Sequence, residues 1–218
     1  MYSEHLQHAQ GQRTYTIIAA VLGWSGLAIQ LYLILFARWA DDASLMGGLV
    51  RFFSFFTVLT NTLVATALTC ALTDRHSRGH RFFRHPAVCS GIAASIALVS
   101  LAYNLLLRHL WQPQGWQLVA NELLHDIMPL AFVVYWWLYV PKGTLRIGHV
   151  LMWITYPVLY FGYVLFRGDM IGDYMYPFIN IGTIGYGKAF INAFGVLAGF
   201  VGVALVVFAV DRFKGRKV

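Results

Sequence analysis

Long apolar segments separated by short polar connections dominate the pattern of this chain. A helix that crosses a membrane needs about 20 mostly apolar residues, and six segments meet that requirement. They are Tyr15–Ala37, Leu49–Thr73, Pro86–Leu107, Leu118–Val140, Arg146–Phe166 and Ala189–Val210. The connections are too short to fold as separate soluble domains. The pattern therefore predicts one domain over residues 1–218, an all-α, polytopic membrane protein with six transmembrane helices.

Composition and charge support this class and add an orientation. Of the 218 residues, 59% are hydrophobic and 11% are charged, whereas soluble domains carry about 25% charged residues. Five basic residues fall on one predicted side, namely Arg38, Arg51, Arg108, Arg167 and Lys188; the opposite side holds Arg13, Arg75, Arg78, Arg81, Arg84, Lys142, Arg146, Arg212, Lys214, Arg216 and Lys217. Because Lys and Arg are enriched in cytoplasmic loops, this bias predicts that both termini lie in the cytoplasm.

The basic segment "TDRHSRGHRFFRH" has two interpretations. It could bind nucleic acid, or it could be a cytoplasmic loop that lies beside anionic lipid. The net charge of +7 is explained mainly by topology, so we favour the loop and expect membrane lipids, not nucleic acid, as partners.

Ionisable side chains interrupt the fourth apolar segment. Glu122, His125, Asp126 and Pro129 follow the spacing i, i+3, i+4, i+7, which is one face of a helix. A charged group in lipid costs about 2.5–3.5 kcal/mol, so this face should turn inward, towards the polar faces of other helices or a wet cavity. Proline has no amide hydrogen for the carbonyl four residues earlier. We therefore expect the helix to open at His125.

Polar groups on neighbouring helices are predicted to share that cavity. Thr57 and Asn61 lie one turn apart on the second segment, and Asn104 lies near the outer end of the third. At about 1.5 Å per helical residue, Thr57 and His125 both lie about 10 Å below the outer face. This arithmetic assumes straight helices that begin near Leu49 and Leu118.

Three segments carry a likeness to a known family. "FFSFFTVLTN" pairs aromatic residues with a threonine, "LLHDIMPL" places a histidine before a proline, and "YMYPFINIGTIGYGK" is a Tyr-Pro-Phe segment followed by glycines. Together with the six spans they resemble the androgen-induced protein and androgen-dependent TFPI-regulating protein family and its bacterial six-helix relatives. The animal members are membrane hydrolases of fatty acid esters of hydroxy fatty acids, with a threonine nucleophile and a histidine.

This resemblance implies that Thr57 is the nucleophile, that His125 is the base, and that the protein lies in the inner membrane of a bacterium. Thr60, one turn further along the same helix, is the competing threonine. The chain departs from the animal proteins in the spacing from His125 to Pro129, which is one residue shorter, and in the acidic Asp126. These two departures concern the identity of the substrate more than the Thr57–His125 pair.

The chemistry of such a site is coherent. A threonine hydroxyl needs a neighbouring base, and histidine titrates near neutral pH. We expect Glu122 to orient the ring and Asn61 or Asn104 to stabilise the oxyanion, with Asp126 nearby as a further supporting group. No cofactor is implied, and no metal is expected because the two cysteines lack zinc-site spacing.

Other classes of function fit parts of the pattern. Mid-depth ionisable residues, prolines and glycines also describe a small-molecule or lipid carrier or channel, which is the main alternative. A haem protein would need histidines on facing helices, and only His125 is well placed. A scaffold would not need the ionisable cluster. The Gly-rich "INIGTIGYGK" lacks phosphate-loop spacing and is expected to be a loop over the mouth of the bundle.

Overall fold

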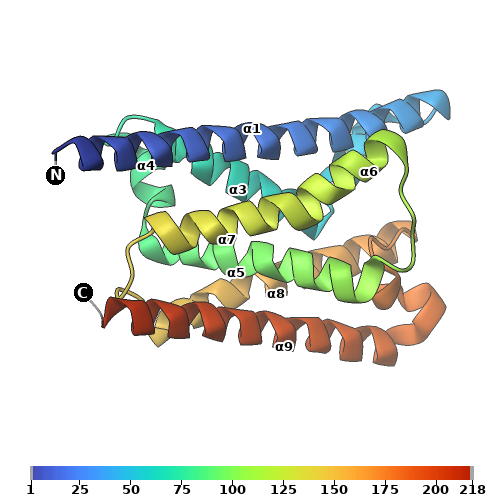
Figure 1. Ribbon diagram of the computed structural model, residues 1–218. Helices are drawn as coiled ribbons and strands as arrows, with labels where there is room; N and C mark the ends of the chain where they lie inside the picture. The colour runs from blue at the N-terminus through green and yellow to red at the C-terminus, as the bar shows by residue number, and fades with distance from the viewer. Residues whose placement is uncertain (1, 217–218) are drawn as a thin grey trace.

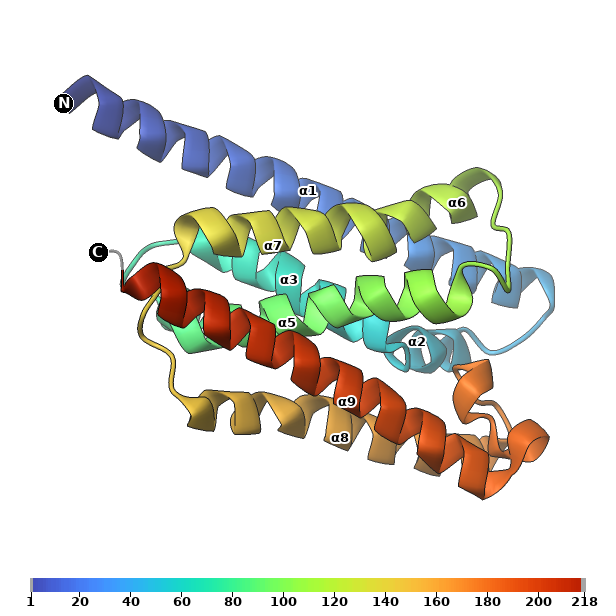
Figure 2. The ribbon, with the colours of Figure 1, turned by 60° about the horizontal axis from the view of Figure 1, so that its bottom comes forward.

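The protein is a bundle of long helices (Figures 1 and 2). The computed structural model describes residues 2–216, and its side chains from residue 7 onwards except residue 8. The regular elements are α1 (Tyr2–Ala40), α2 (Leu45–Phe53), α3 (Phe56–Leu72), α4 (Arg78–Phe83), α5 (Pro86–Ala102), η1 (Tyr103–Leu107), α6 (Gly115–Glu122), η2 (Leu123–Ile127), α7 (Met128–Tyr139), α8 (Ile147–Ile171), η3 (Pro177–Ile179) and α9 (Ile181–Gly215). Both ends of the chain lie at the same end of the bundle.

Five continuous helical stretches among the described residues are long and apolar enough to cross a membrane. Five candidate spans are Ala9–Ala40, Pro86–Leu107, Gly115–Tyr139, Ile147–Ile171 and Ile181–Gly215, and the bent pair of α2 and α3 gives a sixth if it counts as one span. The prediction of an all-α, polytopic membrane protein is thereby confirmed. Of the basic residues used for orientation, Lys217 lies outside the described residues.

Helix α5 occupies the centre of the bundle. It packs against α3, α7, α8 and α9, and 11 of its 17 residues are buried. Gly91 lets Trp153 of α8 approach closely, because a Cβ at this glycine would lie 2.6 Å from the Trp153 ring. The indole of Trp153 donates to the Ala87 carbonyl at 3.0 Å. The core thus fixes α8 and α9 relative to the helices that carry the site.

The predicted continuous helix Leu49–Thr73 is wrong. The chain bends by 76° between α2 and α3, and Phe55 at the bend is extended. The Ser54 carbonyl accepts from the Tyr160 hydroxyl of α8 at 2.9 Å instead of continuing the helix. Thr57 therefore lies in the first turn of α3, and the depth calculated from a straight helix at Leu49 does not apply.

The prediction of a glycine-rich loop over residues 179–188 is also wrong for most of its length. Helix α8 ends at Gly172, whose left-handed backbone (φ 70°) closes the helix. The true connection is short, and α9 already begins at Ile181 with a kink at Gly185 (φ 75°). The Tyr-Pro-Phe residues, not the glycines, form the segment that reaches the site.

Candidate functional site

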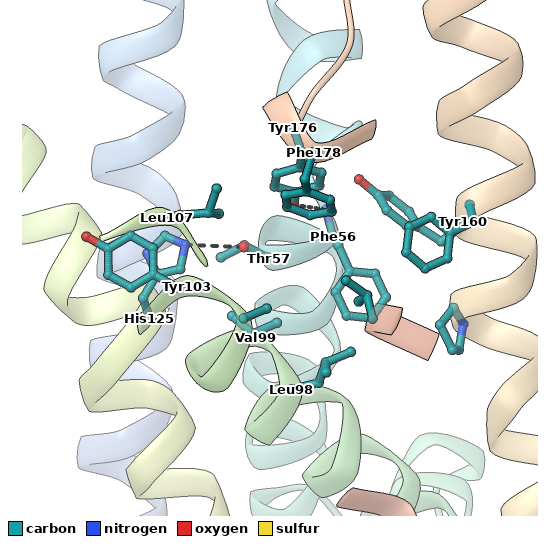
Figure 3. Close-up of a pocket in the computed structure, with 14 residues that line it drawn as sticks. Phe56, Thr57, Leu98, Val99, Tyr103, Leu107, His125, Tyr160, Tyr176 and Phe178 are labelled. Carbon is teal, nitrogen blue, oxygen red and sulfur yellow. Dashed lines mark hydrogen bonds between the residues drawn. The ribbon is translucent and has the colours of Figure 1, made fainter. Parts of the chain in front are cut away.

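Thr57 and His125 meet between α3 and η2. The Thr57 Oγ1 lies 3.3 Å from the His125 Nε2 (Figure 3). The other ring nitrogen, Nδ1, lies 3.0 Å from the backbone carbonyl of Asn121. Since a carbonyl only accepts, the hydrogen-bond network assigns the proton to Nδ1 and leaves a lone pair on Nε2. The Thr57 hydroxyl then donates to Nε2, which is the arrangement a general base requires.

A π-helical turn creates the position of His125. In η2 the amide of Met128 bonds the Leu123 carbonyl, five residues earlier. Continuing this pattern would pair residue 129 with the Leu124 carbonyl, but Pro129 has no N–H. The Nδ2 of Asn61 fills the gap at 3.0 Å. The helix opens here as expected, although the carbonyl that gains the new partner is that of Leu124 rather than that of His125.

Asn61 is a brace rather than a cavity residue. Its Nδ2 also donates to the Thr57 carbonyl at 2.9 Å, and the side chain is fully buried. Both amide hydrogens are therefore in use, so the expectation that Asn61 stabilises an oxyanion is not supported by its contacts. Instead, one side chain ties the backbone beside Thr57 to the backbone beside His125, which holds the pair in register.

Tyr103 and Asn121 complete the support of the histidine, and the sequence argument missed both roles. The Tyr103 ring stacks on the His125 ring with centroids 4.1 Å apart and planes at 26°. The Nδ2 of Asn121 donates to the Tyr103 hydroxyl at 2.7 Å. Tyr103 begins the second π-helical turn, η1, and such turns are frequent at functional sites. A tyrosine next to Asn104 was the only signal available in the sequence.

Three predicted site residues point elsewhere. Asn104 donates to the Asp126 carboxylate at 2.9 Å, Arg108 pairs with the same carboxylate, and Arg108 lies 3.5 Å from Glu122. None of them lines the cavities at Thr57. The prediction that Asn104, Glu122 and Asp126 serve the cavity is therefore wrong, because an arginine after η1 compensates the two carboxylates on the outer flank of the helices.

This placement also contradicts the roles predicted for Glu122 in orienting the ring and for Asn104 in stabilising the oxyanion. The Asn121 carbonyl, not Glu122, holds the histidine ring. The Nδ2 of Asn104 bonds Asp126 and the Ser100 carbonyl, so it has no hydrogen left for an oxyanion. The competing threonine is also separated from the base, since Thr60 lies 3.1 Å from the Tyr156 hydroxyl of α8 and is fully buried.

The connection between α8 and α9 contributes Tyr176. Its hydroxyl accepts from the Phe56 amide at 3.1 Å and interacts with the Thr57 hydroxyl. Burial raises the pKa of this phenol, so it stays protonated. Asp173 anchors the segment, because its side chain pairs with Arg51 and its carbonyl accepts from Arg167 at 2.8 Å.

Two cavities meet at the Thr–His pair. The larger, about 450 Å³, lies between α1, α2, α6 and the 175–177 segment, and polar side chains such as Gln30, Arg51 and Gln117 line it. The smaller, about 50 Å³, is almost entirely apolar and lies between α3, α5, α8 and α9. Both share Thr57 and His125 in their walls.

An apolar groove continues from the smaller cavity to the flank of the bundle. It has a volume of about 500 Å³ and lies between α5 and α9. Phe178 and Val196 line both the groove and the smaller cavity, and Figure 3 shows Phe178 stacked beside Tyr176. The larger cavity, called the polar cavity below because polar side chains interrupt its mainly apolar wall, and the apolar groove thus give the site two approaches.

Comparisons of the chain with protein-family models, curated proteins and solved structures find no match. Within the described residues, no group of three or more His, Cys, Asp or Glu side chains is placed to hold a metal ion.

Proposed function

We propose that this protein is an intramembrane lipid-ester hydrolase in which Thr57 is the nucleophile and His125 the general base. One observation carries the proposal: Thr57 Oγ1 lies 3.3 Å from His125 Nε2 while Nδ1 is held by a backbone carbonyl. The resemblance to the androgen-induced protein family supports the same two residues. Of the ionisable residues Glu122, His125 and Asp126, which first suggested the site, only His125 takes part in the proposed mechanism.

The reaction proceeds in two balanced halves. The Thr57 oxygen attacks the ester carbonyl as its proton moves to His125 Nε2, and the ester C–O bond then breaks as Nε2 returns that proton to the leaving alcohol. Water next attacks the threonyl ester and gives a proton to Nε2. The bond to Thr57 breaks, the threonine oxygen recovers the proton, and a carboxylic acid leaves.

The first turn of α3 supports the developing negative charge. Amides in the first turn of a helix have no intrahelical acceptor and carry the positive end of the helix dipole. Thr57 is the second residue of that turn; its own amide bonds the Tyr176 hydroxyl, and the amide of Val58 follows it directly in the chain. The protonated Tyr176 hydroxyl adds a donor beside them. These groups replace Asn61 and Asn104 as the oxyanion donors of the mechanism.

The two cavities suit the two parts of a lipid ester. The acyl chain enters from the membrane along the groove between α5 and α9 and reaches Thr57 through the apolar cavity. The alcohol portion and water occupy the polar cavity. Arg51 in its wall pairs with Asp173, but a guanidinium has further N–H donors for a carboxylate on the alcohol portion, which agrees with fatty acid esters of hydroxy fatty acids.

The membrane setting is part of the proposal. Counting α2 and α3 as one broken span gives six spans. The basic residues near both termini support a cytoplasmic location for these termini, and the resemblance to bacterial relatives supports an inner membrane.

Ester hydrolysis by the purified protein in detergent tests the function. The wild type should hydrolyse a long-chain fatty-acid ester and react with a fluorophosphonate probe. Thr57→Ala should lose activity and labelling together, and His125→Ala should lower turnover by about 10²–10⁴-fold because the general base is gone. Thr60→Ala is the matched control, since its hydroxyl faces Tyr156 rather than the histidine.

Two outcomes would contradict the hydrolase. Absence of ester hydrolysis by the wild type is one, and full activity of Thr57→Ala is the other. The alternative is then a carrier or channel, which uptake of a lipid or small molecule into liposomes would reveal.

A further inference from the structure

A second polar cavity lies at the opposite end of the bundle from Thr57. It has a volume of about 580 Å³ and lies between the start of α1, the end of α3 and α4. Its wall is formed by Ala9, Gln12, Arg13, Thr16, Ala71, Leu72, Thr73, Arg75, His80 and Arg84. Three arginines and a histidine converge on this cavity, and no carboxylate is among these described residues.

The cationic groups retain hydrogens for a ligand. Arg84 uses one N–H on the Tyr135 hydroxyl at 3.2 Å, and a guanidinium has five. His80 donates Nδ1–H to the Cys70 carbonyl at 3.0 Å, so its Nε2 carries a lone pair and the hydrogens for an anion come from the arginines. Arg13 and Arg75 form no hydrogen bond or ion pair with the described side chains. Guanidinium groups arranged in this way recognise phosphate oxygens.

The height of the cavity indicates a lipid rather than a soluble anion. Arg13 lies near the start of the span Ala9–Ala40, and Leu72 ends the helix of the bent pair. The cavity is thus level with the ends of the membrane-crossing helices, where headgroups lie. Leu72 in its wall and Phe82 on the neighbouring α4 are exposed, which suits contact with acyl chains.

We infer that this cavity binds the phosphodiester headgroup of an anionic phospholipid. Basic pockets between transmembrane helices bind such headgroups through charge and hydrogen bonds together. The site is separate from the Thr–His pair and does not depend on the proposed hydrolase. It also accounts for the basic segment before α5 that the hydrolase mechanism leaves unused.

Binding of a fluorescent short-chain phosphatidylglycerol to the detergent-solubilised full chain tests the inference. The triple variant Arg13→Gln/Arg75→Gln/Arg84→Gln should bind on the order of 100-fold more weakly, at about fivefold for each arginine. The matched control is Arg146→Gln/Arg212→Gln/Arg216→Gln, which removes equal charge from the same end of the bundle outside the cavity. It should change affinity by less than about threefold, because exposed charges beyond about 10 Å are screened.

Two further ligands test whether the bound phosphate belongs to an anionic lipid or to a soluble anion. Phosphatidylcholine, whose choline cation compensates the phosphate, should bind more weakly than phosphatidylglycerol. Inorganic phosphate that displaces the lipid at micromolar concentration would show that a soluble anion is the ligand and would overturn the inference. Equal loss in the control triple, or no loss in the cavity triple, would also overturn it. If the triple variant does not fold, Arg13→Gln/Arg75→Gln decides, with an expected loss of roughly 25-fold.

Discussion

At the level of single residues, the site differs from a serine-type triad in what holds the histidine. A backbone carbonyl, that of Asn121, takes the place of a carboxylate at Nδ1. It fixes the tautomer and the ring orientation without placing a negative charge inside an apolar bundle. The stacked Tyr103 and the Asn121 amide then hold the ring from its face.

Tyr103→Phe tests this support. The ring still stacks on His125, but the Asn121 amide loses its acceptor, and an unsatisfied buried donor costs about 1–3 kcal/mol. We expect kcat to fall by roughly tenfold, because His125 is no longer held in line with Thr57. KM should change little, because the substrate keeps its contacts. Steady-state kinetics on a long-chain ester measure both constants.

Tyr156→Phe provides the control for that substitution. It removes a partly buried hydroxyl whose partner is Thr60. Equal losses of kcat in the two variants would mean that the Tyr103 hydroxyl has no special relation to His125.

Lys142, in the connection between α7 and α8, gives a prediction about pH. Burial, and then the neighbouring Lys214, lower its pKa from 10.5 to about 8. Between these values the unfolded chain binds a proton that the folded chain lacks, so folding stability gains from this residue as pH rises through the window. Thermal unfolding between pH 7 and 10.5 should show a rise in the wild type relative to Lys142→Met. Parallel curves for the two proteins would contradict the shift.

At the level of helices and loops, the groove beside α9 makes a prediction about chain length. Gly195 lines the groove, and a Cβ at this position would meet no atom within 4 Å. Gly195→Leu should therefore fold, but the leucine side chain should fill space that the methylene groups of a long acyl chain would occupy. Burial of each methylene contributes about 0.8 kcal/mol. We expect kcat/KM to fall by roughly tenfold for a palmitoyl ester and to stay unchanged for a butyryl ester.

Gly202→Leu is the matched control on the same helix. Gly202 also has open space around it but lies outside the groove. If both variants treat the two esters as the wild type does, the acyl chain does not use the groove. Loss of both activities in Gly195→Leu would indicate a damaged fold instead.

The sequence predicted the helices better than their interruptions. Apolar length located every long helix, whereas the depth that predicted Thr57 and His125 to be close was calculated for a straight helix that the structure does not contain. The bend at Ser54 did not follow, because it depends on a hydrogen bond from Tyr160, 106 residues away. The outward turn of Asp126 did not follow either, since it depends on Arg108 across a π-helical turn that periodicity of 3.6 residues does not describe.

At the level of the whole molecule, orientation can be measured directly. The ends of the chain lie together (Figure 1), and the basic bias predicts that this end faces the cytoplasm. A C-terminal green fluorescent protein fusion should fluoresce in bacteria, whereas a C-terminal alkaline phosphatase fusion should be inactive. The opposite pair of results would reverse the orientation and place the polar cavity on the cytoplasmic side.

In the proposed mechanism the alcohol departs first because the acyl group is bonded to Thr57, and the two cavities give each of these parts a space of its own. The alcohol can leave through the wide polar cavity as soon as its bond breaks, while the acyl group remains attached to Thr57 in the narrow apolar one. The molecule that enters the vacated cavity next determines the product: water completes hydrolysis, whereas a second alcohol accepts the acyl group. Such a protein would exchange the alcohols of membrane esters as readily as it destroys them, with the balance set by how much water reaches the cavity.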